Sequence, residues 1–292
     1  MELNDLLRMV DVDPGTALVL RHRPSEPAFR KALALLPGGR IDLFEAYQSY
    51  QGEQAELSFI KRLGGTLVSF IEHDVGKAVF VGLYHVRDAK LITREEFWAM
   101  PAQQELKALG NPGWTSDEKR EKRYHFDLER MPHHEDWRGR LIIEWPPVRS
   151  WIRRADTTPL RVLAIHEESL FDGALVPWDE IDFRWSELAI LPGRMRAALE
   201  QWRGIYLIQD SSDGRCYVGS AGGSTNLLGR WLNYASTGHG GNRLLRGRDP
   251  STFRFSILQR LSPDLPPEDV VRIENSWKLR LHTRGLFGLN EN

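Results

Sequence analysis

The sequence has little of what defines several protein classes. Of its 292 residues only Cys216 is a cysteine, which excludes disulfides within the chain and cysteine-cluster zinc or iron–sulfur sites. No apolar run approaches the roughly 20 residues that a membrane-spanning helix needs. The opening residues also lack the apolar core of a secretory signal. We therefore expect a cytoplasmic protein with no membrane partner.

Net charge is also scarce, formally −1, but it is unevenly divided. Residues 203–292 carry 12 basic and 8 acidic side chains, whereas residues 1–202 carry 27 and 32. Eleven of those 12 C-terminal bases are arginine, whose guanidinium suits phosphate better than a lysine ammonium does. A small basic part joined to a larger acidic part indicates nucleic-acid contact by the C-terminal part.

The expected secondary structure changes along the first two-thirds of the chain. Residues 1–72 have a mostly helical pattern, with Ser25-Glu26-Pro27 as one helix start. The patterns that follow predict a helix over 94–110 and several strands. The expected strands are 78–86, 124–128, 141–145 and 160–165. We predict a mixed α/β domain over residues 1–195, with a helical start, a β-rich middle and a boundary near 193–203.

The N-terminal part carries no motif that specifies a function. Its simplest role is substrate recognition or regulation for a second domain. Its aromatic side chains could form a pocket for an extruded nucleic-acid base, or they could simply be core. The tryptophans concerned are Trp98, Trp114, Trp145, Trp151, Trp178 and Trp185.

The C-terminal part has a clearer order of elements. A short strand at 204–208 leads through an Asp213-Gly214 hairpin turn into a strand at 215–218. A helix, a strand and a helix then follow, at 224–235, 253–261 and 267–282. This β-β-α-β-α order predicts an α+β module over 203–292, with a small three-stranded antiparallel sheet and flanking helices.

Two triplets in this module resemble the signature of a known family. Gly204-Ile205-Tyr206 is followed, after ten residues, by Tyr217-Val218-Gly219, and then in order by Arg230, Glu274 and Asn290. This pattern is similar to that of the GIY-YIG nuclease superfamily, and the element order matches its small sheet. The resemblance covers the last third of the chain and implies a phosphodiester-hydrolysing endonuclease that acts on DNA with Mg²⁺ or Mn²⁺.

Each of these residue types has a role in the chemistry of phosphodiester hydrolysis. Glu274 would hold the metal ion, because one carboxylate can bind a Mg²⁺ that keeps most of its waters. Arg230 would clamp the scissile phosphate as a permanent cation. Either Tyr206 or Tyr217 would be the base, if metal and arginine lower the phenol pKa from about 10. The sequence does not choose between the two tyrosines.

Further residues have supporting roles in this interpretation. Tyr234 shares a helix face with Arg230, His239 could move a proton or bind phosphate, and Asn290 could orient the glutamate or a water. Ser220 stands where some members of the family have a lysine. One candidate electrophile is therefore missing, and more of the charge neutralisation falls to Arg230. The glycine-rich 219–223 lacks a P-loop ending and is interpreted as a connector. The expected phosphate contacts after the glycine-rich 238–241 loop are Arg243, Arg246 and Arg248.

Other interpretations remain open at this stage. Each tyrosine could be core, Arg230 could be a solvated helix residue, and Glu274 with Lys278 could be an ordinary i,i+4 surface pair. The biological role we expect is restriction of, or defence against, foreign DNA, with modified DNA as one option. Alternatives are a repair or recombination nuclease, a catalytically silent DNA-binding protein and an RNA nuclease. Cutting both strands would call for a homodimer or two encounters.

Overall fold

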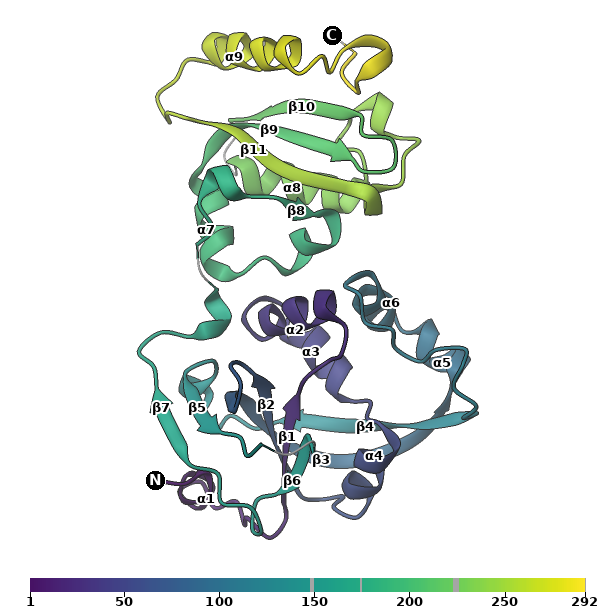
Figure 1. The fold of residues 1–292 in the computed structure, drawn as a ribbon, viewed down its shortest axis with the longest axis vertical. Coiled ribbons are helices and arrows are strands. Elements are labelled where there is room, and N and C mark those ends of the chain that lie inside the picture. Colours follow the sequence, from purple (N-terminus) through teal and green to yellow (C-terminus); the bar gives the residue numbers. More distant parts are fainter. Residues whose placement is uncertain (148–149, 174, 223–225, 292) are drawn as a thin grey trace. The chain divides into compact units, whose positions relative to one another are not determined.

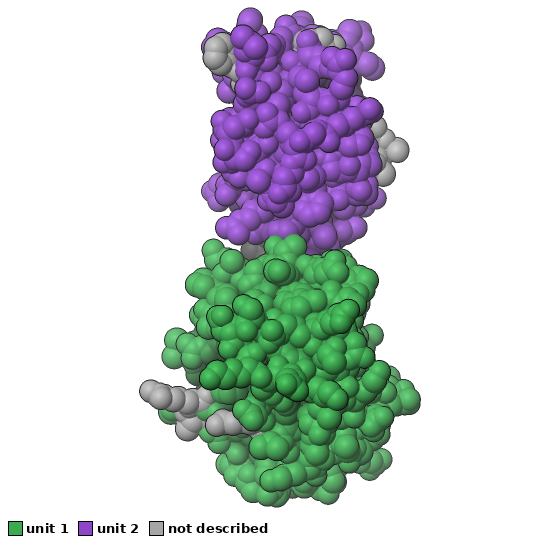
Figure 2. All heavy atoms as spheres, turned by 90° about the vertical axis from the view of Figure 1, so that its right-hand side faces the viewer, with its two compact units in different colours: residues 1–172 green, residues 173–292 purple. Residues whose placement is uncertain are grey.

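The computed structural model describes residues 1–147, 150–173, 175–222 and 226–291, and they form two compact units. Unit 1 is Met1–Asp172 and unit 2 is Gly173–Asn292 (Figure 2). The division falls before the 193–203 boundary that the sequence suggested. The reason is that Leu188, Leu191 and Met195 are buried in the core of unit 2.

Unit 1 is built on a seven-stranded sheet whose strands run in the order β6-β1-β2-β3-β5-β7 (Figure 1). The strand β4 pairs with the far end of the long strand β3. The pair β1–β2 is parallel and the other pairs are antiparallel. The strands are β1 (Ala17–His22), β2 (Thr66–Glu72), β3 (Lys77–Thr93), β4 (Lys122–Arg130), β5 (Leu141–Glu144), β6 (Ile152–Arg154) and β7 (Val162–Ile165).

Helices cover both faces of this sheet, because successive strand residues point to opposite sides. Leu6 of the first helix packs in one core cluster with Val19 of β1, whereas Phe59 of the fourth helix packs in another with Leu20. The helices of unit 1 are α1 (Leu3–Arg8), α2 (Pro27–Gly39), α3 (Ile41–Gln48), α4 (Glu53–Ile60), α5 (Arg94–Ala99) and α6 (Pro101–Ala108).

The expected helical start of unit 1 is only partly correct. Four helices lie there, but β1 and β2 also fall within residues 1–72. Both strands are buried along nearly their whole length, and each holds only a short apolar run that periodicity cannot distinguish from helix. The expected strands from residue 78 onward are present, and the expected 94–110 helix is divided at Pro101 into α5 and α6.

The tryptophans of the chain do not gather into one pocket. Trp114 and Trp145 are fully buried in core clusters of unit 1. Trp178 and Trp185 pack against the core of unit 2. Trp151 differs, because its side chain is 40% exposed.

Unit 2 contains an antiparallel four-stranded sheet in the order β10-β9-β11-β8. Its three main strands are the expected ones: β9 (Arg203–Asp210), β10 (Cys216–Ala221) and β11 (Phe253–Leu261). The fourth, β8 (Phe183–Arg184), comes from the segment that the sequence left ambiguous. The expected β-β-α-β-α order is present, and the chain has the expected α+β class.

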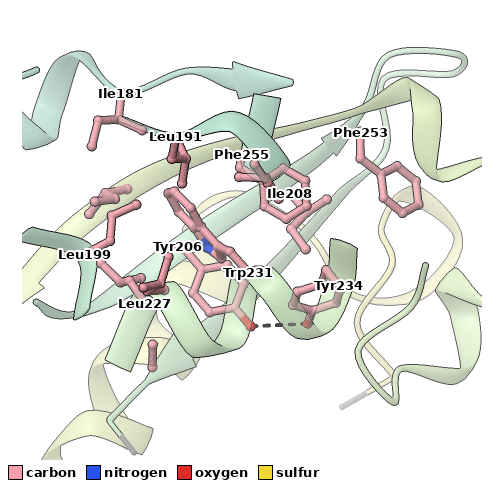
Figure 3. Packing of buried hydrophobic residues seen from close by; sticks show 14 of the residues in the cluster. Ile181, Leu191, Leu199, Tyr206, Ile208, Leu227, Trp231, Tyr234, Phe253 and Phe255 are labelled. Carbon is pink, nitrogen blue, oxygen red and sulfur yellow. Dashed lines mark hydrogen bonds between the residues drawn. The ribbon is translucent and has the colours of Figure 1, made fainter. Parts of the chain in front are cut away.

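Helices also enclose the sheet of unit 2. The helices α7 (Gly193–Gln201) and α8 (Asn226–Thr237) contribute to a large core cluster on one face, which holds Trp231 and Tyr234 (Figure 3). The helix α9 (Pro267–Arg280) packs on the other face through Val270. The expected helix start at 224–225, like Gly223, lies outside the described residues.

Among the described residues, no helix is both long enough and apolar enough to cross a membrane.

Candidate active site

The first two candidate tyrosines lie on neighbouring strands. Tyr206 of β9 stands opposite Gly219 of β10, and Tyr217 lies two residues before that glycine. The two ring centroids are 6.4 Å apart. A Cβ atom at position 219 would lie 2.4 Å from the Tyr206 hydroxyl and 2.9 Å from the Tyr217 ring. The second triplet therefore needs its glycine, because any side chain there would push the two rings apart.

Helix α8 adds a cation and a third tyrosine to this cluster. Arg230 and Tyr234 lie one turn apart, so both reach the Tyr206 side of the sheet. The Tyr206 and Tyr234 hydroxyls are 3.2 Å apart (Figure 3). Arg230 Nη2 donates to both hydroxyls over 3.4 and 3.5 Å, which is long for a hydrogen bond. Its Nε finds no partner within the described part of the chain. The two tyrosine hydroxyls therefore orient the Arg230 side chain, and its Nε remains available as a hydrogen-bond donor.

The electrostatics of the tyrosines differ from the expectation. Burial raises the pKa of Tyr206, neighbouring Tyr217 raises it further, and the opposing effect of Arg230 is smaller. Burial likewise raises the pKa of Tyr234. The protein's own groups therefore raise the phenol pKa of Tyr206 on balance, and the lowering expected from a bound metal stays a prediction. Tyr217 is less enclosed, because its side chain is only partly buried.

A second polar group forms around Glu274 of α9. The Ser220 hydroxyl of β10 donates to Glu274 Oε2, and Lys278 Nζ lies 2.7 Å from Oε1. Lys278 is buried, with 7% of its surface exposed. The i,i+4 spacing thus makes an enclosed ion pair rather than the ordinary surface pair that helix spacing alone would indicate.

The two groups lie on opposite sides of β10. Alternation along the strand places Tyr217 toward the α8 side, where it packs with the Tyr206 cluster. Val218 faces α9, and Ser220 reaches Glu274 on that same helix. Because β10 is the last strand in the sheet order, the two groups share this edge of unit 2.

The residues around Glu274 suit one hydrated Mg²⁺ or Mn²⁺ ion rather than a fully caged ion. Within the described ranges, no three His, Cys, Asp or Glu side chains form a metal-binding group. Each carboxylate oxygen has two lone pairs, and Ser220 and Lys278 each occupy one oxygen. The remaining lone pairs can hold an ion that keeps most of its waters. Lys278 places a competing positive charge beside them.

The side chain of Asn290 is hydrogen-bonded to the backbone of Val218. Its Oδ1 accepts from the Val218 N–H at 2.9 Å, and its Nδ2 donates to the Val218 carbonyl at 2.8 Å. The side chain is buried. The expectation that Asn290 orients Glu274 or a water is therefore replaced by a positioning role: it holds the strand that carries Tyr217 and Ser220.

His239 sits in a hydrogen-bonded turn after α8. Its Nδ1 accepts from the Gly241 N–H at 2.9 Å, so the neutral ring carries its proton on Nε2. Gly240 adopts φ +53°, and a Cβ there would lie 2.5 Å from the Tyr234 ring. The turn packs against the tyrosine cluster, which brings His239 into its neighbourhood.

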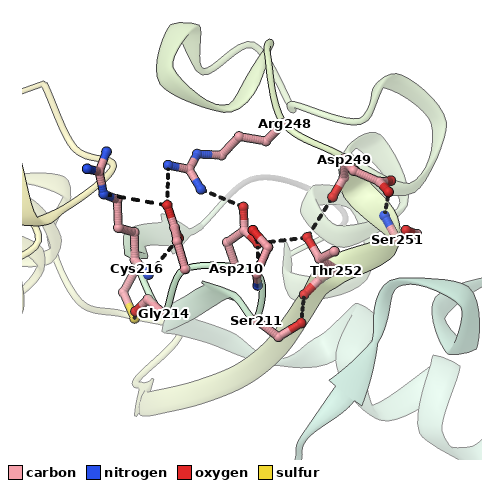
Figure 4. A network of polar contacts seen from close by, with 11 residues as sticks. Asp210, Ser211, Gly214, Cys216, Arg248, Asp249, Ser251 and Thr252 are labelled. Atoms are coloured by element: carbon pink, nitrogen blue, oxygen red, sulfur yellow. Dashed lines mark hydrogen bonds and ion pairs between the residues drawn. The ribbon is translucent and has the colours of Figure 1, made fainter.

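The three arginines expected to contact phosphate have different surroundings. Arg243 is exposed and paired with Glu291, and Arg246 is exposed. Arg248 is bound through Nη1 to Asp210 at 2.6 Å and through Nη2 to Asp213 at 2.9 Å (Figure 4). Arg248 therefore ties its loop to the β9–β10 hairpin.

Two of these features have no role in the interpretation of the sequence. Lys278 was visible only as the second half of an i,i+4 pair, and no pattern shows that it is buried. The contact of Asp210 with Arg248 joins residues 38 apart, which no local spacing reveals. An acidic residue directly before a hairpin turn was the available signal.

Comparisons with known proteins yield few matches. The chain matches no protein-family model and no curated protein. It is similar to solved structures of endonuclease catalytic domains. Both are the catalytic domain of the homing endonuclease I-TevI, one of them a mutant. The mutant is 22% identical to this chain, with a TM-score of 0.27, and the match covers 32% of this chain and 95% of the mutant. The other structure is 24% identical, with a TM-score of 0.26, and the match covers 31% of this chain and 98% of that structure. TM-scores this low do not support a functional conclusion, so the site residues must carry it.

Proposed function

We infer that unit 2 is the catalytic part of a Mg²⁺-dependent DNA endonuclease of GIY-YIG type, which hydrolyses phosphodiester bonds. The supporting observation is the position of Arg230. Its guanidinium extends from helix α8 and is half-buried beside Tyr234 of the same helix and Tyr206 of β9, one of the two strands that carry the GIY-YIG-like triplets. A cation with unused hydrogen-bond donors at this position can bind an oxyanion such as a phosphate.

Arg230 is the proposed phosphate clamp. Burial alone would lower the pKa of Arg230, but the oxygens of Tyr206 and Tyr234 outweigh this and raise it. The guanidinium therefore stays charged and presents a rigid fork of donors to the phosphoryl oxygens. The weak bonds to the two hydroxyls hold its orientation before substrate arrives, so little reorganisation is needed in the transition state.

Tyr217 is the better proposed proton acceptor of the two tyrosines. The Tyr206 hydroxyl is fully buried and engaged by Tyr234 and Arg230, and its raised pKa disfavours loss of its proton. Tyr217 is partly exposed on the edge strand, so a water or substrate can reach it. Tyr206 then acts as a neutral support for Arg230.

Glu274 is the proposed metal ligand, with Ser220 and Lys278 fixing its carboxylate. When bound there, Mg²⁺ or Mn²⁺ would neutralise charge on the phosphoryl oxygens and favour deprotonation of water. The substrate would have to contact both Glu274 and Arg230, which lie on opposite sides of β10. Ser220 and Lys278 each hold one oxygen, so the ion would take a remaining lone pair and would compete with the Lys278 ammonium for the carboxylate.

The biological role we propose is restriction of foreign DNA in the cytoplasm. Unit 2 is joined to the larger unit 1, to which we give substrate recognition or regulation. Arg243 and Arg246 supply exposed positive charge for phosphate contacts, and Arg248 contributes by holding their loop. One catalytic group cuts one strand at a time, so a homodimer is the proposed state for double-strand cutting.

The test is cleavage with Mg²⁺ of unmodified plasmid, DNA with modified cytosines and single strands. Wild type is compared with Glu274→Ala, and with Glu274→Gln, which keeps an acceptor for Lys278. Both variants should lose cleavage and keep DNA binding, because they remove the metal ligand and leave the arginines. Glu268→Ala, an exposed glutamate on the same helix, is the matched control and should cut normally.

Folding of each variant is checked by thermal melting. Full cleavage by Glu274→Gln would refute the metal assignment. Absence of cleavage in wild type on every substrate, with DNA binding retained, would replace the nuclease with a DNA-binding protein.

A further inference from the structure

Unit 1 contains a cavity of about 460 Å³ that has no part in the catalytic groups of unit 2. This volume is within the range of small-molecule sites. Charged, aromatic and imidazole side chains share its walls. Those that matter for its chemistry are Arg21, His22, Arg23, Tyr50, Arg123 and Trp151.

The cavity lies where the parallel part of the sheet ends. Arg21 and His22 are the last residues of β1, which pairs in parallel with β2. The lining continues through the connection Arg23–Glu26 to the start of α2. In sheets with parallel strands, ligands commonly bind outside the carboxyl ends of those strands.

Three residues of the lining carry buried nitrogens that lack hydrogen-bond partners among the described residues. These atoms are Arg21 Nε, His22 Nε2 and Arg123 Nε. Burial lowers the pKa of His22 to about 3, so its imidazole is neutral at physiological pH. These three nitrogens have almost no exposed surface, so contacts to a ligand would come from the exposed guanidinium of Arg23, whose side chain is 55% exposed.

Three arginines, Arg21, Arg23 and Arg123, and one glutamate, Glu26, line the cavity, so its charge is in positive excess. Arg21 and Arg23 both pair with Glu72, at 3.3 and 2.8 Å. Two guanidinium groups thus share one carboxylate, and Arg153 is close enough to act on Arg21 as a third cation. An anionic group in the cavity would complete this arrangement.

Aromatic rings supply the other part of the surface. Tyr50 packs edge-on against Phe97 with centroids 4.8 Å apart, which fixes its orientation. Trp151 is partly exposed in the lining. Flat aromatic surfaces of this kind bind nucleic-acid bases by stacking.

We propose that this cavity binds a nucleotide, with the phosphate at Arg23 and the base against the aromatic side chains. The same chemistry is offered by a free mononucleotide and by a nucleotide extruded from a DNA strand. The site is inferred from unit 1 alone; only the second source rests on the proposed action on DNA.

The experiment is calorimetric titration of the full chain with deoxynucleoside monophosphates, including 5-methyl-dCMP, with inorganic phosphate, and with short single- and double-stranded oligonucleotides. Arg23→Ala is the main variant, because Arg23 is 55% exposed at its side chain and the fold should survive its loss. Arg87→Ala is the matched control: Arg87 lies in the same unit, is 53% exposed and pairs with Glu129. Trp151→Ala and Trp151→Phe test the stacking surface.

We expect Arg23→Ala to weaken nucleotide binding about tenfold or more, because it removes charge-assisted hydrogen bonds to phosphate. Arg87→Ala should change it less than about twofold, and Trp151→Phe should retain more affinity than Trp151→Ala. Arg23-dependent binding of mononucleotides identifies a free nucleotide as the ligand, whereas Arg23-dependent binding of oligonucleotides alone identifies an extruded one.

Three results would overturn the proposal: no binding of any nucleotide or oligonucleotide, equal losses in Arg23→Ala and Arg87→Ala, or inorganic phosphate binding as well as the nucleotides do. Cleavage assays on the same variants separate this outcome from failure of the nuclease proposal.

Discussion

Replacing Arg248 by methionine tests whether this arginine supports the fold or contacts DNA. In the structure it joins the loop before β11 to the β9–β10 hairpin (Figure 4). Its main partner is Asp210, whose side chain is 2% exposed. Arg248→Met keeps much of the side-chain bulk and removes only the charge and the donors. The variant should therefore report on the ion pair itself.

The structure gives the size of the expected effect. Removing one partner of a buried ion pair costs about 3–5 kcal/mol, because the other charge stays buried and uncompensated. Asp210 keeps three other donors: the Ser212 N–H, the Ser212 hydroxyl and the Thr252 hydroxyl. These partners hold the cost to the lower end, about 3 kcal/mol. Opening of unit 2 should become roughly a hundredfold more frequent.

The effect should depend on pH with a definite sign. Burial would raise the pKa of Asp210, but the hydrogen bonds from Ser212, Arg248 and Thr252 outweigh it and hold the pKa well below its ordinary value. Ionised Asp210 therefore stabilises the fold above the unfolded pKa of about 4, and this contribution is lost as the pH falls through the folded pKa. The difference between wild type and Arg248→Met should be full at pH 7 and shrink at acid pH, because folded Asp210 takes up its proton first in the variant, which lacks the guanidinium, and only at lower pH in wild type.

Native-state hydrogen exchange is the suitable assay, because it reports on unit 2 alone. The amides of Ile208 and Phe255, in the central strands, exchange when that unit opens. Arg254→Met is the control, since Arg254 forms an exposed pair with Asp182 and its loss should cost at most about 1 kcal/mol. Equal exchange rates in the two variants would refute the reasoning. Loss of DNA binding with unchanged hydrogen exchange would indicate that Arg248 contacts DNA, as the sequence predicts.

Three further substitutions probe the catalytic groups. Arg230→Ala should lower the cleavage rate by several powers of ten with the fold retained, and an unchanged rate in a cleavage assay would place the phosphate clamp elsewhere. Gly219→Ala should cost about 1–3 kcal/mol in urea unfolding, because its Cβ would meet the Tyr206 hydroxyl; unchanged stability would contradict the close approach. Lys278→Met should lower the melting temperature, and Mg²⁺ should restore it more than in wild type, because Glu274 loses a competing cation. No response to Mg²⁺ would argue against a metal at Glu274.

The fold of unit 2 was largely predictable because its signals are local. Asp213-Gly214 specifies a hairpin, the alternation of 253–261 specifies a strand, and Pro267 starts a helix. In unit 1, by contrast, β1 and β2 are short buried runs whose partners lie far along the chain. Their identity as strands depends on pairing with each other, which a local window does not contain.

The site residues show the same limit at the level of single side chains. Order along the chain was enough to select Tyr206, Arg230 and Tyr234, and the structure brings them together. Their electrostatics were not predictable, because the raised pKa of Tyr206 comes from burial under α8. The roles of Asn290 and Arg248 depended on partners 72 and 38 residues away, Val218 and Asp210.

The contact between Asn290 and Val218 also limits how copies of this protein can associate. An edge strand ordinarily exposes unpaired N–H and C=O groups that can recruit a strand from another molecule. On β10, the Asn290 amide occupies both groups of Val218, and the Leu289 N–H binds the Cys216 carbonyl. The tail thus seals this stretch of the edge, so a homodimer of this chain would have to form through side chains on another surface rather than by extending the sheet at residues 216–218.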